Sequence, residues 1–354
     1  MKVVIAPDSF KGTISNNEVA RAIAEGWLVA RPLDEVTLRP MADGGEGTLE
    51  TIAASQSDAI NVSVNADHSI DWLLLSDGTA IVELARICGI TISKNLDPMN
   101  SHTYLFGEVL REAALDSRVK RIVATVGGSA STDGGVGALI ALGARFLNDK
   151  GELIPLGGIG LQDIASIDLS GITPPPVNGV TCLVDVTNPL LGPSGTAQIF
   201  SPQKGANTNQ IGQLETGLAH FREISGQEDF AGAGAAGGTP FGLKLGWNIT
   251  IESGAITVAS LIGLLEAIAV ADIVITGEGR LDSQSSYGKV VGAVRQIAEE
   301  YEKKVLYCVG SSEEPLGVDG IALIDIAPSI AEAMRDPDKW LVKAGSELAS
   351  RVKS

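Results

Sequence analysis

The stretch KRIVATVGGSASTDGGVGALIALGARFLN, from Lys120 to Asn148, decides the fold. Its first part, Arg121–Val126, is β-branched and apolar apart from its first residue and one threonine, which predicts a buried strand. Residues 127–137 then contain five glycines, three hydroxyls and one carboxylate, and no large side chain. The Ala/Leu-rich segment Ala138–Leu147 predicts a helix. A strand that passes through small residues into a helix is the repeating unit of an α/β protein.

The small-residue loop has two interpretations. Its glycines are explained by a tight turn that requires unusual backbone angles. Alternatively, bare backbone N–H groups at the positive end of the following helix bind a phosphate or a carboxylate. Ser129, Ser131 and Asp133 favour anion binding, because a turn requires neither the two hydroxyls nor the carboxylate.

Length and composition limit the possible functions. The chain has 354 residues, enough for about two domains with separate cores, and its 44% hydrophobic content with 42 glycines indicates a globular protein. A net charge of −17 and an aromatic content of 4% argue against nucleic acid and membrane surfaces as partners. The three cysteines are far apart in apolar surroundings, so we expect reduced thiols and no zinc site. The short apolar run near Met1 is no signal sequence, which predicts a soluble cytoplasmic protein.

Strands and helices alternate at both ends of the chain. A capping box at Ser15 and Glu18 predicts a helix to Ala30, Val290–Tyr301 predicts another, and a last helix begins at Ile330. The predicted strands are Lys2–Ala6, Glu35–Arg39, Asp272–Thr276, Val305–Val309 and Ile321–Ile326. This set is typical of a doubly wound parallel sheet.

The middle of the chain has a different pattern. After Ser57 the apolar residues alternate at period two, which predicts antiparallel strands. A helix near Gly107–Leu115, the deciding βα unit and a strand at Thr181–Asp185 follow. We therefore predict an α/β protein with a discontinuous doubly wound (Rossmann-like) domain, residues 1–57 and 246–354, and an inserted α/β domain, residues 58–245.

The standard nucleotide and hydrolase fingerprints are incomplete. Gly288–Lys289 is followed by valine instead of the hydroxyl of a P-loop. Gly232, Gly234 and Gly237 have the spacing G-x-G-x-x-G, but no strand precedes them, so we interpret the match as chance or a flexible loop. The Gly-Gly-Ser-Ala-Ser run misses the nucleophile elbow by one position. A dehydrogenase and a serine hydrolase are both disfavoured.

Polar residues gather where five predicted strands end. The five segments are Asp8–Gly12, Asp43–Thr48, Gly127–Gly137, Asp185–Pro189 and Gly277–Asp282. Ligands of open α/β sheets bind outside the carboxyl ends of the strands. Carboxylates, hydroxyls, glycines and a few cations at such ends suit phosphoryl transfer, which needs ligands for Mg²⁺ and donors for spreading negative charge. Any one aspartate could instead cap a helix, and Lys11 and Lys204 could be solvated charges; the joint occurrence favours the phosphoryl-transfer interpretation.

With these residues in view, the chain resembles the bacterial type I glycerate kinase (glycerate 2-kinase) family. The matching motifs stand in the family's order and extend from residue 1 to beyond residue 300. They are APDSFKG (6–12), PMADGGEGT (40–48), GGSASTDGGVG (127–137), DVTNPLLG (185–192), PQKGA (202–206), GAGAAGG (232–238) and ITGEGRLDSQ (275–284) with Gly288–Lys289.

The resemblance implies ATP-dependent phosphorylation of D-glycerate with Mg²⁺, at the 2-hydroxyl more often than the 3-hydroxyl. It also implies two α/β domains, one of them discontinuous, with the active site in the cleft between them. The resemblance does not settle the roles of individual residues, for which we state hypotheses.

Asp185 is our choice for the group that accepts the hydroxyl proton. Further catalytic candidates are Asp8, Asp133 and Lys11. Candidates for binding the nucleotide phosphates are Gly44, Gly45, Gly277, Glu278, Gly279, Arg280 and Lys289. Candidates for substrate binding are Ser9, Ser129, Ser131, Asn188 and Lys204, and candidates for Mg²⁺ are Asp43 and Asp282.

One departure from the family pattern concerns the substrate. Leu105 and Phe106 replace a glycine and a small hydroxyl residue before a helix, and their bulk would narrow the pocket and remove a donor if that helix end touches substrate. Two alternatives therefore stay open beside glycerate kinase. One is a kinase for another small hydroxy acid, and the other is a non-catalytic hydroxy-acid sensor on the same fold.

Overall fold

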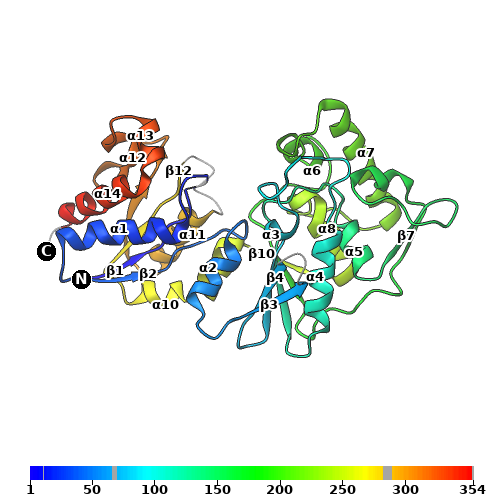
Figure 1. Cartoon of the computed structure of the whole chain (residues 1–354), viewed down its shortest axis with the longest axis horizontal. Helices are drawn as coiled ribbons and strands as arrows, with labels where there is room; N and C mark the ends of the chain where they lie inside the picture. The colour runs from blue at the N-terminus through cyan, green and yellow to red at the C-terminus, as the bar shows by residue number, and fades with distance from the viewer. Residues whose placement is uncertain (11, 66–69, 282–288, 353–354) are drawn as a thin grey trace. The chain divides into compact units, whose positions relative to one another are not determined.

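The computed structural model describes residues 1–10, 12–65, 70–281 and 289–352. These residues form two compact units (Figure 1). Unit 1 comprises Met1–Asp43, Glu50–Gln56 and Gly254–Ser354, and unit 2 comprises Gly44–Leu49 and Ser57–Ser253. Each unit has a large sheet and a hydrophobic core of its own, so the described residues form an α/β protein with two main sheets and two short two-stranded pairs.

The sheet of unit 1 is parallel throughout, in the order β15-β13-β11-β1-β2. Its strands are β1 (Lys2–Ile5), β2 (Glu35–Leu38), β11 (Ile273–Thr276), β13 (Lys304–Val309) and β15 (Gly320–Ala322). A short parallel pair, β12 (Arg280–Leu281) and β14 (Ser311–Ser312), lies beyond it. All five strands predicted at the two ends of the chain thus lie in one sheet, because their apolar runs are buried together.

The helices of unit 1 are α1 (Asn16–Ala30), α2 (Thr48–Ser55, whose first two residues belong to unit 2), α9 (Gly254–Leu261), α10 (Leu264–Ala269), α11 (Val290–Glu300), α12 (Leu323–Ile326), α13 (Ile330–Arg335) and α14 (Pro337–Arg351). Of these, α1, α11, α12 and α14 contact strands of this sheet. The predicted capping box of α1 is confirmed. Figure 1 shows α1 beside α14. A Cβ at Gly26 would lie 1.9 Å from the carbonyl oxygen of Val342, so glycine permits the close approach of the two helices.

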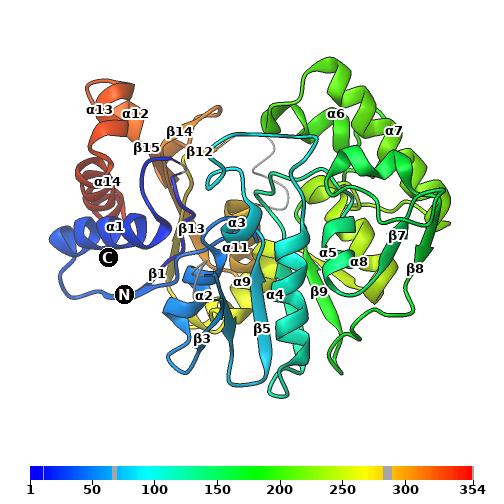
Figure 2. The same cartoon turned by 45° about the vertical axis from the view of Figure 1, so that its right-hand side comes forward.

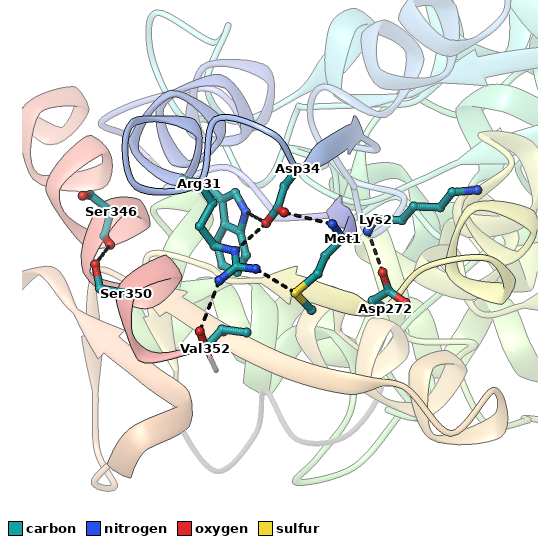
Figure 3. Close-up of polar contacts among 9 residues, drawn as sticks. Met1, Lys2, Arg31, Asp34, Asp272, Ser346, Ser350 and Val352 are labelled. Atoms are coloured by element: carbon teal, nitrogen blue, oxygen red, sulfur yellow. Dashed lines mark hydrogen bonds and ion pairs between the residues drawn. The ribbon is translucent and has the colours of Figure 1, made fainter. Parts of the chain in front are cut away.

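A polar network fixes the start of β1 against the end of α1 (Figure 3). The carboxylate of Asp34 accepts from the Met1 amino group at 2.9 Å, from Nε of Arg31 at 2.6 Å and from the Trp27 indole at 3.0 Å. Arg31 also donates to the carbonyl of Val352 at 3.2 Å. These donors hold the pKa of Asp34 at about 2, against the opposing effect of burial.

The sheet of unit 2 is mixed, in the order β10-β9-β6-β5-β4-β3. Its strands are β3 (Ile60–Asn65), β4 (Ile70–Leu74), β5 (Thr79–Glu83), β6 (Arg121–Thr125), β9 (Val180–Leu183) and β10 (Thr250–Glu252), and β7 (Arg145–Leu147) pairs separately with β8 (Ser166–Asp168). The antiparallel strands predicted after Ser57 are confirmed for β3, β4 and β5, whereas β5, β6, β9 and β10 run parallel.

The helices of unit 2 include α4, which lies alongside β5 (Figure 2). The set is α3 (Ala85–Cys88), α4 (Tyr104–Leu115), α5 (Val136–Ala141), α6 (Thr196–Phe200), α7 (Thr208–Ser225) and α8 (Thr239–Trp247). Among the described residues of unit 2, 3₁₀ turns occur at Gly158–Asp163, between β7 and β8, at Pro202–Lys204, between α6 and α7, and at Ala235–Gly238, before α8; another, Gly317–Asp319, lies in unit 1. Phe106 is fully buried in the core of unit 2, and its bulk therefore fills the core.

Three predicted elements are wrong in part. The helix predicted to Leu147 ends at Ala141, because Gly143 turns at φ +110° and the chain enters β7. The strand predicted over Ile321–Ile326 stops at Ala322 and continues as α12. The last helix is divided into α13 and α14, because Asp336 between them is non-helical and a proline begins α14.

The three cysteines are free thiols, and burial raises the pKa of Cys308 to about 12.

In the described part of the chain, no helix has the length and apolar character needed to cross a bilayer.

Candidate active site

Unit 1 contains a pocket of about 640 Å³ at the carboxyl ends of its strands. It is lined by residues that follow β1, β2, β11, β13 and β15, which is where parallel α/β sheets bind ligands. Seven of the predicted site residues line it together: Asp8, Ser9, Asp43, Glu278, Gly279, Arg280 and Lys289. They come from opposite ends of the sequence, which the sheet order brings side by side.

Backbone contacts hold the loops around this pocket. The amide of Asp8 donates to the carbonyl of Gly277 at 2.8 Å, so the segments after β1 and β11 run together. The Asp8 carboxylate accepts from the Ser9 amide at 2.6 Å and from its hydroxyl at 3.3 Å. A Cβ at Gly277 would lie 1.6 Å from the carbonyl oxygen of Cys308, so this glycine permits the backbones to meet and does not itself line the pocket.

The loop after β11 supplies a carboxylate and a guanidinium. Its backbone accepts from the amides of Gly310 and Ser311 at 3.0 Å each, which fixes it beside the end of β13. Glu278 has a relative exposure of 8%. Arg280 pairs with Glu313 at 2.7 Å, but both side chains are largely exposed, so the pair contributes little to stability.

The opposite charges in this pocket suit a polyphosphate together with a divalent cation. Lys289 is the N-cap residue of α11, so its ammonium adds to the partial positive charge of a helix N-terminus. Among the described residues, groups of three or more His, Cys, Asp or Glu side chains close enough to hold a metal ion do not occur. Mg²⁺ in phosphoryl-transfer sites is typically held by one or two carboxylates and the phosphates themselves. One or two of the pocket carboxylates Asp8, Asp43 and Glu278 would suffice for that kind of site.

The Ser129–Asp133 loop, in unit 2, is buried. The carboxylate of Asp133 accepts from the amide and hydroxyl of Thr103, both at 2.8 Å, and from the amides of Gly135 and Gly137 at 3.2 and 3.1 Å. Its relative exposure is 0%. Because four donors occupy it, the geometry favours a positioning role for Asp133, which joins the N-termini of α4 and α5, over that of a proton acceptor.

Lys204 is also buried, with 2% exposure. Its ammonium donates to the backbone carbonyl of Ser131. Burial lowers the pKa of Lys204 to about 8, against the opposing effect of the nearby Asp133 carboxylate. The hydroxyls of Ser129 and Ser131 lie 2.7 Å apart and bond to each other. Lys204 therefore holds the loop that carries both serines.

The two predicted glycine loops of unit 2 meet through bare backbone. The Gly127 amide donates to the carbonyl of Gly44 at 3.2 Å, and a Cβ at Gly127 would lie 2.7 Å from Cα of Gly45. The carboxylate of Glu83 accepts from the amides of Gly47 at 3.0 Å and Leu49 at 2.7 Å. Glu83 is buried at the end of β5. Its contact with the glycine loop was not predicted from the sequence; the one signal for it was an acidic residue at the end of an apolar strand.

Asp185 and Asn188 lie in the segment that follows β9. Oδ1 of Asp185 accepts from the Ser253 hydroxyl at 2.8 Å, and the side chain is partly accessible. Asn188 donates from its side chain to the carbonyl of Ser194 at 2.7 Å, so its amide stabilises its own loop. The predicted catalytic Lys11 and the predicted metal ligand Asp282 lie outside the described residues.

The glycine tract that matched G-x-G-x-x-G packs closely against the Ser129–Asp133 loop. A Cβ at Gly237 would lie 2.0 Å from the carbonyl oxygen of Ser131, and the Gly134 amide donates to the Gly237 carbonyl at 2.9 Å. A Cβ at Gly234 would lie 2.1 Å from the Pro189 carbonyl oxygen. Close backbone packing therefore explains these glycines, which the interpretation as chance or a flexible loop did not anticipate.

Comparison with known proteins identifies the relatives of this chain. The model of the glycerate kinase family matches residues 3–353. The chain belongs to the glycerate kinase family. It is 38% identical to a glycerate 2-kinase of Escherichia coli K12, over 99% of this chain and 98% of that protein, and 36% identical to a glycerate kinase of Haemophilus influenzae, over 99% and 98%.

A solved structure extends the comparison to the fold. A crystal structure from Salmonella typhimurium LT2, assigned provisionally as glycerate kinase 2, is 34% identical and covers 99% of this chain and 97% of its own, with a TM-score of 0.80. The protein is thus a glycerate kinase family enzyme, and the resemblance seen in the motifs is confirmed.

Proposed function

We propose that this glycerate kinase family enzyme transfers the terminal phosphoryl group of ATP to D-glycerate, with Mg²⁺, and that 2-phosphoglycerate is the product. Family membership supports a kinase reaction. The observation that carries the proposal is the unit 1 pocket, in which three carboxylates and two cations from distant parts of the chain gather at strand ends. In this proposal, residues 1–57 and 246–354 form a Rossmann-like domain that binds the nucleotide, and residues 58–245 form a second domain inserted into it.

In this proposal, the residues of the unit 1 pocket hold the nucleotide. Lys289 and Arg280 supply positive charge to phosphate oxygens, and Gly279 keeps the loop backbone accessible. Asp43 and Asp8 offer oxygen ligands to Mg²⁺, which when bound neutralises charge on the phosphates. Predicted nucleotide contacts at Gly44 and Gly45 stay part of the proposal.

The segments of unit 2 hold glycerate in this proposal. Asp185 accepts the proton of the attacking hydroxyl, and Ser253 orients its carboxylate through the 2.8 Å hydrogen bond. Ser129, Ser131 and Lys204 provide hydroxyls and positive charge for the substrate carboxylate. Phosphoryl transfer has a loose transition state, so positioning and charge matter more than the strength of the base.

The test is a coupled assay of ADP release with D-glycerate, followed by ³¹P NMR of the product. A signal from the 2-phosphate supports the proposal, and a 3-phosphate overturns the assigned position. ADP release with another small hydroxy acid alone would overturn the substrate. D-glycerate binding without ADP release would support the sensor alternative.

Asp185→Asn tests the proposed base. We expect kcat to fall by about 10²–10⁴, with little change in ATP affinity, because the base acts in the transition state. Asp71→Asn is a matched control. Asp71, on β4, is also half-buried, and its carboxylate also accepts from a serine hydroxyl, that of Ser63 at 2.9 Å. Near wild-type kcat in Asp185→Asn would refute the assignment.

A further inference from the structure

The pocket of unit 1 is chemically divided along the sheet. Its carboxylates, Asp8, Asp43 and Glu278, follow β1, β2 and β11, which are neighbours in the sheet. The residues that line it after the edge strand β15 are apolar: Leu323, Ile324, Ile330, Ala333, Met334 and Pro337. Arg280 and Lys289 lie at the same end as the carboxylates. That end therefore suits a polyphosphate that contacts the two cations and a divalent cation, so one ligand that occupies the whole pocket would be anionic at this end and apolar at the other.

The apolar end of the pocket includes two apolar side chains that are largely exposed. Ile330 and Met334 are one helical turn apart on α13, and they are 64% and 61% exposed. Ala333, on the same helix, is 6% exposed and packs into the core, and the Ser329 hydroxyl caps the helix by accepting from the Glu332 amide at 3.2 Å. The helix is thus anchored on one side while Ile330 and Met334 present apolar surface to the pocket.

Small residues separate the two ends. Gly310 and Ser311 follow β13, the strand that lies between β11 and β15. A Cβ at Gly310 would lie 2.3 Å from the carbonyl oxygen of Gly279, so this position admits no side chain. The Gly310 carbonyl accepts from the Ile324 amide at 3.2 Å, which fixes α12 at the pocket edge. Gly310 and Ser311 thus place no large side chain between the two ends of the pocket, which suits a linking group such as a pentose.

We propose that Ile324, Ile330 and Met334 form the nucleobase site of the phosphoryl donor, and that the enzyme discriminates little between purine bases. This inference rests on the proposed function, in which the anionic end holds the triphosphate. The described side chains of the apolar end carry no nitrogen or oxygen atom. A wall of this kind holds a flat ring by burial of apolar area, whereas strong rejection of a close analogue requires buried hydrogen-bonding groups.

The inference is tested by binding alone, without turnover. Calorimetric titration with Mg²⁺ and ADP, GDP or IDP should give dissociation constants within about tenfold of one another. Met334→Ser and Ile330→Ser should each weaken ADP binding about tenfold, because each removes apolar contact with the ring. Inorganic triphosphate, which lacks a base, should bind these variants as it binds the wild type.

Val318→Ser is the matched control, since Val318 is 75% exposed in the same unit and does not line the pocket. Its ADP affinity should equal that of the wild type. Unchanged ADP affinity in both α13 variants, or an ADP preference above about 100-fold over GDP, would overturn the inference. Equal losses for ADP and inorganic triphosphate would also overturn it.

Failure of the inference can be separated from failure of the proposed function. If the two α13 variants bind ADP about tenfold more weakly while the wild type does not phosphorylate D-glycerate, the nucleobase site stands and the proposed reaction is wrong. If D-glycerate is phosphorylated while the α13 variants bind ADP normally, the reaction stands and the nucleobase site is wrong.

Discussion

Lys204 gives the stability of unit 2 a pH dependence that can be worked out from its surroundings. The ammonium is buried against the Ser131 carbonyl, and burial lowers the pKa of Lys204 from 10.5 to about 8. On raising the pH, the folded protein therefore loses this proton near pH 8, whereas the unfolded chain keeps it until about pH 10.5. Between these values the unfolded state binds more protons, so the free energy of unfolding increases with pH.

The expected size follows from the pKa difference. A fall from 10.5 to about 8, at about 1.4 kcal/mol for each pH unit, corresponds to at most about 3 kcal/mol over the whole interval. Between pH 8 and 9.5 the increase should reach about 2 kcal/mol. Lys204→Met has no proton to lose and should lack the increase. The buried thiols of Cys182 and Cys308, whose pKa values are raised by burial, are common to both proteins, so the comparison largely cancels their effect.

The measurement is urea-induced unfolding of wild type and Lys204→Met, followed by tryptophan fluorescence at half-unit pH intervals from 7 to 9.5. The quantity of interest is the difference between the two free energies of unfolding at each pH. A difference that stays constant within about 0.5 kcal/mol would refute the reasoning, because it would mean that Lys204 titrates alike in both states. Circular dichroism at pH 7 checks that the variant is folded.

Two further substitutions test the architecture of unit 1. Asp34→Asn should lower the free energy of unfolding by about 1–2 kcal/mol at pH 7, allowing for screening by solvent. Because the folded pKa of Asp34 is lowered from 3.8 to about 2, this loss should shrink as the pH falls from 4 towards 2; a loss that is independent of pH would contradict it. Gly277→Ala should cost about 3 kcal/mol or more, since its Cβ would lie 1.6 Å from the Cys308 carbonyl oxygen. Gly212→Ala, in open space on α7, should be neutral or stabilising, and equal melting temperatures for the two alanine variants would disprove the argument.

The elements of the parallel sheet in unit 1 were predictable because their signals are local. An unbroken apolar run marks a buried strand, and Ser15 with Glu18 marks a helix start. The end of α5 was not predictable in this way. The turn at Gly143 has a positive φ, and a Cβ there would lie 2.3 Å from the carbonyl oxygen of Gly171, so the position requires glycine because of a residue distant in sequence.

The candidate site could also be predicted only in part from the sequence. That carboxylates at strand ends share a pocket follows from the parallel order of the strands, and Asp8, Asp43 and Glu278 fulfil it. The surroundings of Asp133 could not be predicted, because its partner Thr103 precedes it by 30 residues with no motif to connect them. The apolar wall on α13 was missed because two exposed apolar side chains carry no sequence signature of a ligand.

The allocation of Gly44–Leu49 to unit 2 has a practical consequence for dissecting the molecule. A fragment that contains only residues 57–253 would lack the two amides, of Gly47 and Leu49, that donate hydrogen bonds to the Glu83 carboxylate at the end of β5. It would also lack the Gly44 carbonyl against which Gly127 rests. Such a fragment should need a synthetic peptide spanning residues 40–56 to regain its native core, which makes the enzyme a natural candidate for split-protein complementation.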